Sequence, residues 1–376
     1  MRIKFGDLRV SDDAKKYVNE CLSSSMISGG RKVKQLEDSW GKLFGYKYNI
    51  AMSNGTDANK AALMTLYDLS NDVQPLDEII APALAFAAVG NSIRAAGFTP
   101  KFVDVKRDTM NIDPKLIEEK ITDRTRAIMA VHTMGKPNDM QSIMDIAKRH
   151  DLRVIEDCCE AHGGQYNDQF VGTFGDAATF SFYVAHIVSC GDGGMLSTNY
   201  RETRDLVDSI KHHGRKPGSL YFDHQRYGLN FRMSDLTASI GLPEVGRFWE
   251  IFDKRKENLN YLTDATKDLE DIAYFVNEEE HEVVSPHAFS LTLRDSKYDY
   301  SKLYSFLQNN GIDCKRNFGS MPTQHQAFAY LGHKLGEFPE AEYVGDNGLH
   351  LGIHQFLSTA DLDYISDKLH EYFGRK

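Results

Sequence analysis

Leu152-Arg153-Val154-Ile155-Glu156-Asp157 is the stretch that decides the fold, and it runs directly into Cys158-Cys159-Glu160-Ala161-His162-Gly163-Gly164. A short apolar run of this kind is typical of a strand buried in a sheet. Residues 78–81, 101–105 and 127–131 have the same character, and helical spacing separates them, most clearly over 140–150. Strands separated by helices predict a mostly parallel sheet, which binds ligands beyond the carboxyl ends of its strands.

The chain changes character after about residue 245. A long charged stretch with helical spacing covers 248–269, an alternating segment covers 287–293, and a helical stretch covers 361–372. We therefore predict an α/β protein with a large cofactor-binding domain of residues 1–245 and a smaller α+β domain of residues 246–376.

Composition and charge narrow the possible partners. The 376 residues are 41% hydrophobic and 26% charged, and the formal net charge is -10. No basic excess is present to neutralise phosphates, so we expect neither nucleic acid nor a membrane surface as partner. The first residues contain no apolar core of signal-peptide length, which predicts a cytoplasmic protein. The five cysteines are an odd number without CxxC spacing, which favours reduced thiols over a disulfide framework or a zinc site.

The first motif is Ser53-Asn54-Gly55-Thr56-Asp57-Ala58, which precedes a stretch of helix-forming residues. The N-terminus of a helix offers free backbone N–H groups and the positive end of a dipole, which suit a phosphate monoester. The same residue types are also ordinary helix caps, and the motif alone leaves both interpretations open.

The second motif is the strand-end carboxylate Asp157. Such a carboxylate can pair with a protonated pyridine nitrogen, and the ring then becomes an electron sink. A helix cap is the alternative interpretation of an isolated aspartate in this position.

The third motif, Thr179-Phe180-Ser181-Phe182-Tyr183-Val184-Ala185-His186, runs on to Gly191-Asp192-Gly193-Gly194. The Ser181 hydroxyl suits the same phosphate. His186, five positions after Ser181, is the basic side chain of this segment. A fourth segment, 228–235, follows His212-His213-Gly214-Arg215 and could consist of loop and cap residues.

Taken in order with Ala81-Pro82-Ala83-Leu84-Ala85-Phe86, these segments resemble the motif series of the DegT/DnrJ-type sugar aminotransferases over nearly the whole chain. The resemblance implies the fold-type I aminotransferase architecture, pyridoxal phosphate as cofactor, and a homodimer with shared active sites. It implies that Phe86 stacks on the pyridine ring and that Asp157 binds the ring nitrogen. The phosphate would be held by Gly55, Thr56 and Ser181, and by Asn230 of the neighbouring subunit. Leu229 departs from the tyrosine common in the family.

The family's Schiff-base lysine is replaced by His186, and no lysine occurs between Lys148 and Lys211. A histidine at this position is similar to the sugar 3-dehydratases of the family, among them those that act on GDP-4-keto-6-deoxymannose. Glu160 matches the dehydratase pattern better than the glutamine frequent in aminotransferases. The stretch 316–326, which contains Phe318, loosely resembles the dehydratases' substrate loop.

Lysine links covalently to the cofactor and shuttles a proton, whereas histidine acts only as a base near neutral pH. The resemblance therefore implies that His186 acts as the base with noncovalently held pyridoxamine phosphate. The substrate would be a nucleotide-linked 4-keto-6-deoxyhexose that loses its C3 hydroxyl, and L-glutamate would regenerate the cofactor. We expect no iron–sulfur cluster, because Cys314 is the only cysteine beyond residue 190.

Two alternatives remain open from the sequence. One is another lysine-free reaction on a sugar, such as decarboxylation or oxidative deamination. The other is a noncatalytic protein that binds the cofactor or a nucleotide sugar, in which His186 is a satisfied polar residue. Arg215, Arg226 and Arg316 are candidate contacts for a diphosphate or carboxylate, and each is equally well explained as a surface ion pair.

Overall fold

The computed structural model describes residues 2–70, 72–219, 222–295 and 297–375. Half of the fourteen described strands form a seven-stranded sheet. In spatial order these strands are β1 (Tyr48–Met52), β9 (Gly194–Thr198), β8 (Ala177–Ser181), β5 (Arg153–Asp157), β4 (Thr125–Val131), β2 (Glu78–Pro82) and β3 (Thr99–Val103).

Six of these strands run in the same direction, and β9 alone runs against its neighbours β1 and β8. The prediction of a mostly parallel sheet is therefore confirmed. The carboxyl ends of β1, β2, β5 and β8 meet at one edge of the sheet, and every predicted motif in the first 190 residues follows one of these four strands.

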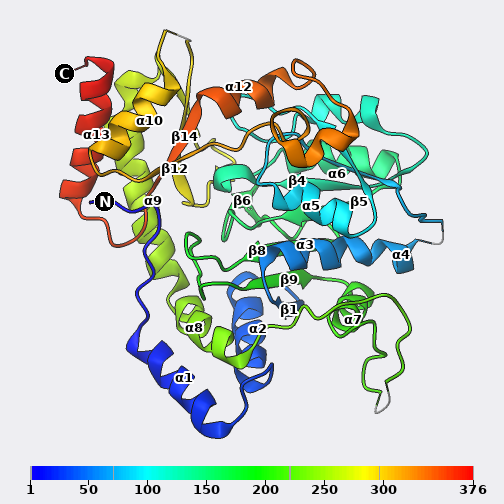
Figure 1. Ribbon diagram of the computed structural model, residues 1–376. Helices are drawn as coiled ribbons and strands as arrows, with labels where there is room; N and C mark the ends of the chain where they lie inside the picture. The colour runs from blue at the N-terminus through cyan, green and yellow to red at the C-terminus, as the bar shows by residue number, and fades with distance from the viewer. Residues whose placement is uncertain (1, 71, 220–221, 296, 376) are drawn as a thin grey trace.

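Helices cover the large sheet and connect its strands (Figure 1). They are α1 (Asp12–Ser24), α2 (Arg31–Phe44), α3 (Gly55–Met64), α4 (Leu66–Leu69), α5 (Ala88–Ala95), α6 (Met140–Arg149), α7 (Arg201–Ile210) and α8 (Asp235–Gly246). Local chemistry sets their ends: in α6, the Asp139 side chain accepts a hydrogen bond from the backbone N–H of Ser142 at 3.1 Å. The predicted helical stretch 140–150 is thus confirmed to within one residue.

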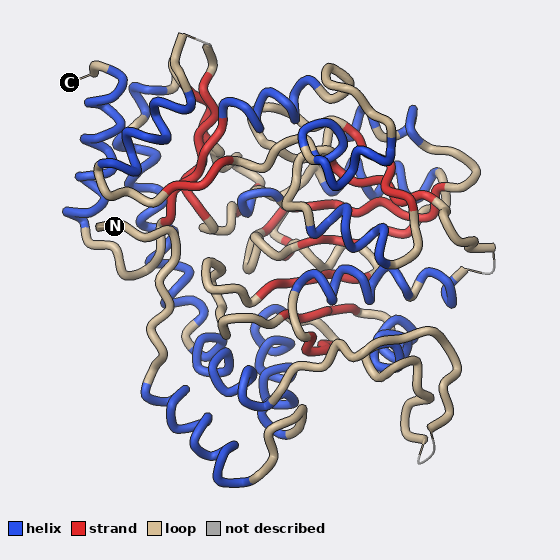
Figure 2. Tube along the Cα trace, viewed as in Figure 1, coloured by secondary structure: helices blue, strands red, loops and turns tan. Residues whose placement is uncertain are grey.

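The C-terminal third builds a second sheet, in the order β10 (Ala273–Phe275), β12 (Ala288–Leu293), β14 (Gly348–Gly352) and β13 (Cys314–Arg316). Its helices are α9 (Phe248–Ala265), α10 (Tyr300–Asn309), α11 (Met321–Gln324), α12 (Pro339–Asn347) and α13 (Thr359–Phe373). Figure 2 shows the two groups of strands as separate sets. A small third sheet joins β11 (Glu282–Val283), β6 (Gln165–Tyr166) and β7 (Gln169–Phe170).

The N-terminal segment lies against the C-terminal third (Figure 1). Ile3 pairs with Ile312 and is buried in the same apolar cluster as Leu291 and Leu351. The first residues thus pack with the smaller sheet although they precede α1 in the chain. Within the described residues, no helix combines the length and apolar character that a membrane crossing requires.

The predicted strand of residues 101–105 is displaced by two residues in the structure, where β3 begins at Thr99 and ends at Val103. Just after β3, the Asp104 carboxylate accepts backbone hydrogen bonds from Glu340 at 3.0 Å and Ala341 at 2.9 Å. This side chain therefore holds the start of α12.

Candidate active site

Asp157 lies at the carboxyl end of β5 and is buried. Asn59 on α3 donates from Nδ2 to Asp157 Oδ2 at 2.7 Å, and the backbone N–H of Cys159 donates to Oδ1 at 3.0 Å. The Thr179 hydroxyl donates to Asn59 Oδ1, which turns the amide N–H group toward the carboxylate. These bonds fix the orientation of the Asp157 carboxylate at the ligand-binding edge of the sheet.

Gly55 is buried at the N-terminus of α3. A Cβ on Gly55 would lie 2.8 Å from Ser181 Cβ and 2.9 Å from Cys159 Sγ, so the close packing at this point requires glycine. Asn54 caps the helix by accepting the backbone N–H of Asp57 at 2.8 Å. The capping interpretation is therefore correct, and Ser181 packs against Gly55 at the same helix end.

Phe86 follows β2 and has 63% of its surface exposed, although Ala83, Leu84 and Ala85 just before it are buried. The ring of Phe318 lies edge-on to Phe86, with 6.0 Å between ring centroids. A backbone hydrogen bond of 2.8 Å from Met321 to Ala83 holds the two segments together. Phe86 therefore offers an aromatic surface on which a flat ring can stack.

His186 lies in the loop after β8, and its backbone N–H donates to the Tyr183 carbonyl at 3.0 Å. Its Nδ1 is completely buried and has no hydrogen-bond partner among the described residues, whereas Nε2 is not enclosed in this way. Burial, and after it the positive charge of Arg255, lowers the pKa of His186 to about 3. The imidazole is therefore neutral at pH 7.

Glu160 lies close to His287, with 3.6 Å between Glu160 Oε1 and His287 Nε2. The other carboxyl oxygen, Oε2, accepts the backbone N–H of Met134 at 2.7 Å. The pKa of Glu160 is raised to about 8, mainly by burial; the Met134 hydrogen bond opposes this rise, and the nearby Asp157 adds a smaller increase. The ring of His287 is 5.2 Å from that of His186 between centroids. At neutral pH the Glu160 carboxyl group is therefore mostly protonated. It lies close to His287, whose ring is next to that of His186.

Sequence reasoning missed three residues of this site: Asn59, Arg255 and His287. Asn59 is the fifth residue of α3, one turn after Gly55, and that spacing was a usable signal. Arg255 is part of the charged stretch of α9, and His287 directly precedes β12. Neither of these two residues carries a local pattern that points to the site.

The remaining predicted residues lie away from these contacts. Asn230 is exposed, and its Oδ1 accepts a bond from Arg232 Nε at 2.9 Å. Arg226 contacts Asp68 at 3.1 Å and the Ser209 hydroxyl at 2.7 Å. Arg215 donates to the Ser219 carbonyl at 2.8 Å, and Arg316 pairs with Asp346 at 2.6 Å. Roles for these four residues in binding substrate or a partner subunit stay predictions.

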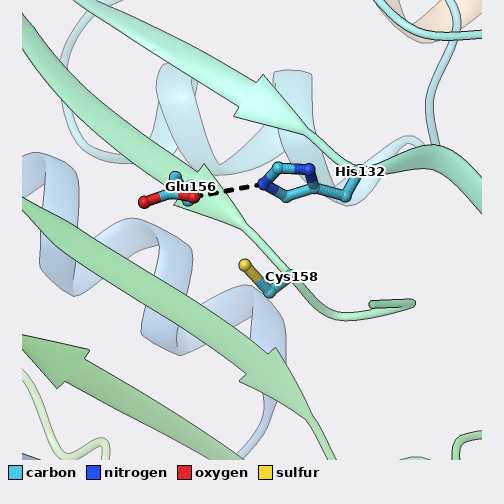
Figure 3. Close-up of side chains that lie close together, drawn as sticks. All are labelled: His132, Glu156 and Cys158. Atoms are coloured by element: carbon cyan, nitrogen blue, oxygen red, sulfur yellow. Dashed lines mark hydrogen bonds and ion pairs between the residues drawn. The ribbon is translucent and has the colours of Figure 1, made fainter. Parts of the chain in front are cut away.

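One buried cluster has the composition of a metal site. His132, Glu156 and Cys158 place their ligand atoms within 4.8 Å of one another (Figure 3). His132 Nδ1 already accepts the backbone N–H of Asn138 at 3.1 Å, so Nε2 carries the proton and donates to Glu156 at 3.3 Å.

The Glu156 carboxylate also accepts three backbone N–H groups of the loop 172–175, at 2.6 to 2.9 Å. Burial, and after it Glu156 and Asp157, raises the pKa of the Cys158 thiol well above its usual range. Because metal binding needs a free imidazole nitrogen and a thiolate, this arrangement acts as a structural network that anchors the loop.

The residues of the site fit a pyridoxal or pyridoxamine phosphate. Phe86 presents an exposed aromatic ring, and the Asp157 carboxylate is fixed at the end of β5, where it could pair with a ring nitrogen. The N-terminus of α3, where Thr56 is exposed and Ser181 packs against Gly55, offers the backbone N–H groups that suit a phosphate. The unpartnered nitrogen of His186 lies in the loop that leaves the same sheet edge.

Comparison with known proteins agrees with this fit. The model of the DegT/DnrJ/EryC1/StrS aminotransferase family matches residues 9–370. GDP-perosamine synthase from Escherichia coli O157:H7 is 34% identical in an alignment of length 370 that covers 96% of each chain. GDP-4-keto-6-deoxy-D-mannose 3-dehydratase from Escherichia coli O55:H7 is 30% identical in an alignment of length 376 that covers 94% of this chain and 96% of the relative.

Among solved structures, a mutant of GDP-4-keto-6-deoxymannose-3-dehydratase with bound GDP-perosamine superposes with a TM-score of 0.87 at 26% identity. The superposition covers 98% of this chain and 100% of that one. The synthase is more similar to this chain than the dehydratase of the same comparison, so identity alone does not decide the reaction. The chain belongs to the DegT/DnrJ/EryC1/StrS aminotransferase family, whose members are pyridoxal phosphate-dependent enzymes that modify sugars.

Proposed function

We propose that this protein is a cytoplasmic 3-dehydratase of a nucleotide-linked 4-keto-6-deoxyhexose in deoxysugar biosynthesis. The observation that carries the proposal is His186, a neutral imidazole at the position of the family's lysine in a segment with no lysine between 148 and 211. The names of two relatives contain GDP-linked sugars, which supports GDP as the first nucleotide to test.

Bound pyridoxamine phosphate would supply an amine for the C4 ketone and a ring that takes up electrons. Asp157 would hold the ring nitrogen in its protonated form, because Asn59 and the Cys159 amide fix the carboxylate. Phe86 would hold the ring by stacking, and the end of α3 with Ser181 would bind the phosphate.

His186 would accept, at its accessible Nε2, a proton from the carbon next to the cofactor's amine, and would donate that proton to the C3 hydroxyl, which leaves as water. Histidine cannot link covalently to the cofactor as lysine does, so the cofactor's amine would be free to react with the ketone. Hydrolysis would release a sugar that lacks the C3 oxygen, and the nitrogen that the cofactor supplied would leave as ammonia. L-glutamate would then restore the amine form of the cofactor and become 2-oxoglutarate. We further propose that two chains form a homodimer whose active sites are shared between the subunits.

Mass spectrometry of the products tests this function. The protein is incubated with pyridoxal phosphate, L-glutamate and 4-keto-6-deoxyhexoses linked to GDP, CDP, dTDP or UDP. A sugar product lacking one oxygen, formed together with 2-oxoglutarate, is expected. An amino sugar would contradict the role of His186, and no product across the panel would favour another lysine-free reaction or a binding protein.

The variant His186→Lys distinguishes a residue that acts only as a base from a residue that links covalently to the cofactor. We expect it to lose dehydration and to retain pyridoxal phosphate as a mass increment after borohydride reduction. His370→Lys makes the same exchange on α13, where His370 pairs with Asp268 at 3.0 Å, and should keep the wild-type products. Full dehydration by His186→Lys would refute the proposed role.

A further inference from the structure

Arg255 is a buried cation surrounded by carbonyl groups. Its guanidinium donates to the carbonyls of Pro286 at 3.0 Å and His287 at 2.7 Å, and to those of Ala185 at 3.1 Å and His186 at 3.2 Å. Only 2% of its surface is exposed. Among the described residues, no carboxylate lies within ion-pair distance of Arg255.

A buried positive charge without a counterion is unusual, because burial of a charge is normally offset by a partner of opposite sign. In this protein, four backbone carbonyl dipoles replace the counterion of Arg255. Burial lowers the pKa of Arg255 to about 10. The guanidinium therefore stays charged at neutral pH. Its fork also joins the catalytic loop after β8 to the segment that enters β12, two parts of the chain about a hundred residues apart.

We propose that Arg255 is a positioning residue, whose guanidinium fixes the loop of His186 and places a positive charge beside that residue. The catalytic meaning of this role rests on the proposed function. The guanidinium contacts the carbonyl of His186 itself, so its charge acts within the same residue that carries the base.

Other groups around His186 are weaker candidates for this effect. The rings of His162, His287 and Tyr183 lie 5.8, 5.2 and 6.1 Å from that of His186 between centroids. Burial lowers the pKa of both His162 and His287 well below the usual range, so neither histidine is charged at neutral pH. Glu160 lies behind His287 and is mostly protonated at pH 7. Arg255 is therefore the group that carries a charge at His186.

Two substitutions separate charge from packing. Arg255→Lys keeps the charge and loses the fork, whereas Arg255→Gln keeps a side-chain N–H donor and loses the charge. NMR of ¹³Cε1-labelled histidine, in full-length protein without cofactor or substrate, measures the protonated fraction of His186 at pH 5. The variant His186→Gln identifies its signal among the fourteen histidines.

Arg255→Gln is expected to raise the protonated fraction of His186 about tenfold or more at pH 5, which is one pH unit in its titration. Arg255→Lys should stay near wild type. The control Arg294→Gln removes an arginine bonded to the Ala273 carbonyl at 3.3 Å and should change nothing.

Equal protonation of His186 in wild type and a folded Arg255→Gln overturns the proposal, as does an equal rise in the Lys and Gln variants. If Arg255→Gln does not fold, wild type still provides a test, because a largely protonated His186 at pH 5 also overturns the proposal. The measurement needs no turnover, so a failed dehydration assay would refute the proposed function without touching this result.

Discussion

The substitution Glu160→Gln tests the electrostatics of the site in a quantity that does not depend on the substrate. The carboxyl pKa is 4.5 in its unperturbed state and about 8 in the folded protein, mainly because the group is buried. The folded state therefore binds this proton more tightly than the unfolded state. At pH values below 4.5 both states are protonated, and the free energy of unfolding falls as pH rises from 4.5 through 8.

The expected size of this loss follows from the shift. A difference of about 3.5 pH units corresponds to about 5 kcal/mol over the whole titration, at about 1.36 kcal/mol per unit. Most of the folded molecules still hold the proton at pH 6 and have lost it at pH 9, so this interval contains about 2.5 kcal/mol of the loss. Glutamine cannot ionise and can still accept the Met134 N–H bond.

Urea denaturation of the cofactor-free protein at pH 6 and pH 9, at one protein concentration, measures the effect. We expect the free energy of unfolding of wild type to fall by about 2.5 kcal/mol more than that of Glu160→Gln between these pH values. Glu118→Gln is the control, since Arg149 and His150 lower the pKa of that exposed carboxylate and it is ionised at both pH values. An equal fall in wild type and Glu160→Gln would show that Glu160 does not titrate between pH 6 and pH 9 in the folded protein, and a pKa of about 8 would be wrong.

Three further predictions address the cofactor site and the buried polar cluster. Asp157→Asn should lower the dehydration rate roughly hundredfold or more with an unchanged circular dichroism spectrum, because the carboxylate that faces the ring nitrogen is lost; a wild-type rate would remove Asp157 from the mechanism. Phe86→Ala should weaken binding of pyridoxamine phosphate roughly tenfold in calorimetry, since ring stacking contributes about 0.5–1.5 kcal/mol, and unchanged affinity would mean that the ring binds elsewhere. His132→Ala should lower the free energy of unfolding by about 1–3 kcal/mol because Glu156 loses a buried donor, while EDTA should leave wild-type stability unchanged. One zinc per chain by elemental analysis would contradict the structural interpretation of that cluster.

The order of strands and helices in residues 1–245 could be predicted from the sequence, because the apolar residues of each element recur with the spacing of a strand or a helix. The apolar run 153–157 is a strand in both descriptions, and α6 begins at the predicted Met140 behind its cap. The predicted strand at β3 is displaced by two residues, and Asp104 just after it binds the backbone of residues 340 and 341. A local pattern contains no information about a partner more than 200 positions away.

The sequence by itself determined the parallel sheet, the motifs at its carboxyl edge and the absence of a lysine between Lys148 and Lys211. These features depend on residue types and short spacings, which are local. Only the tertiary structure decided that Asn59 and Thr179 orient Asp157, that Glu160 meets His287, and that Arg255 holds the His186 loop. These contacts join segments that the crossover connections and the packing of α9 bring together. Burial there removes the water that would otherwise set each pKa.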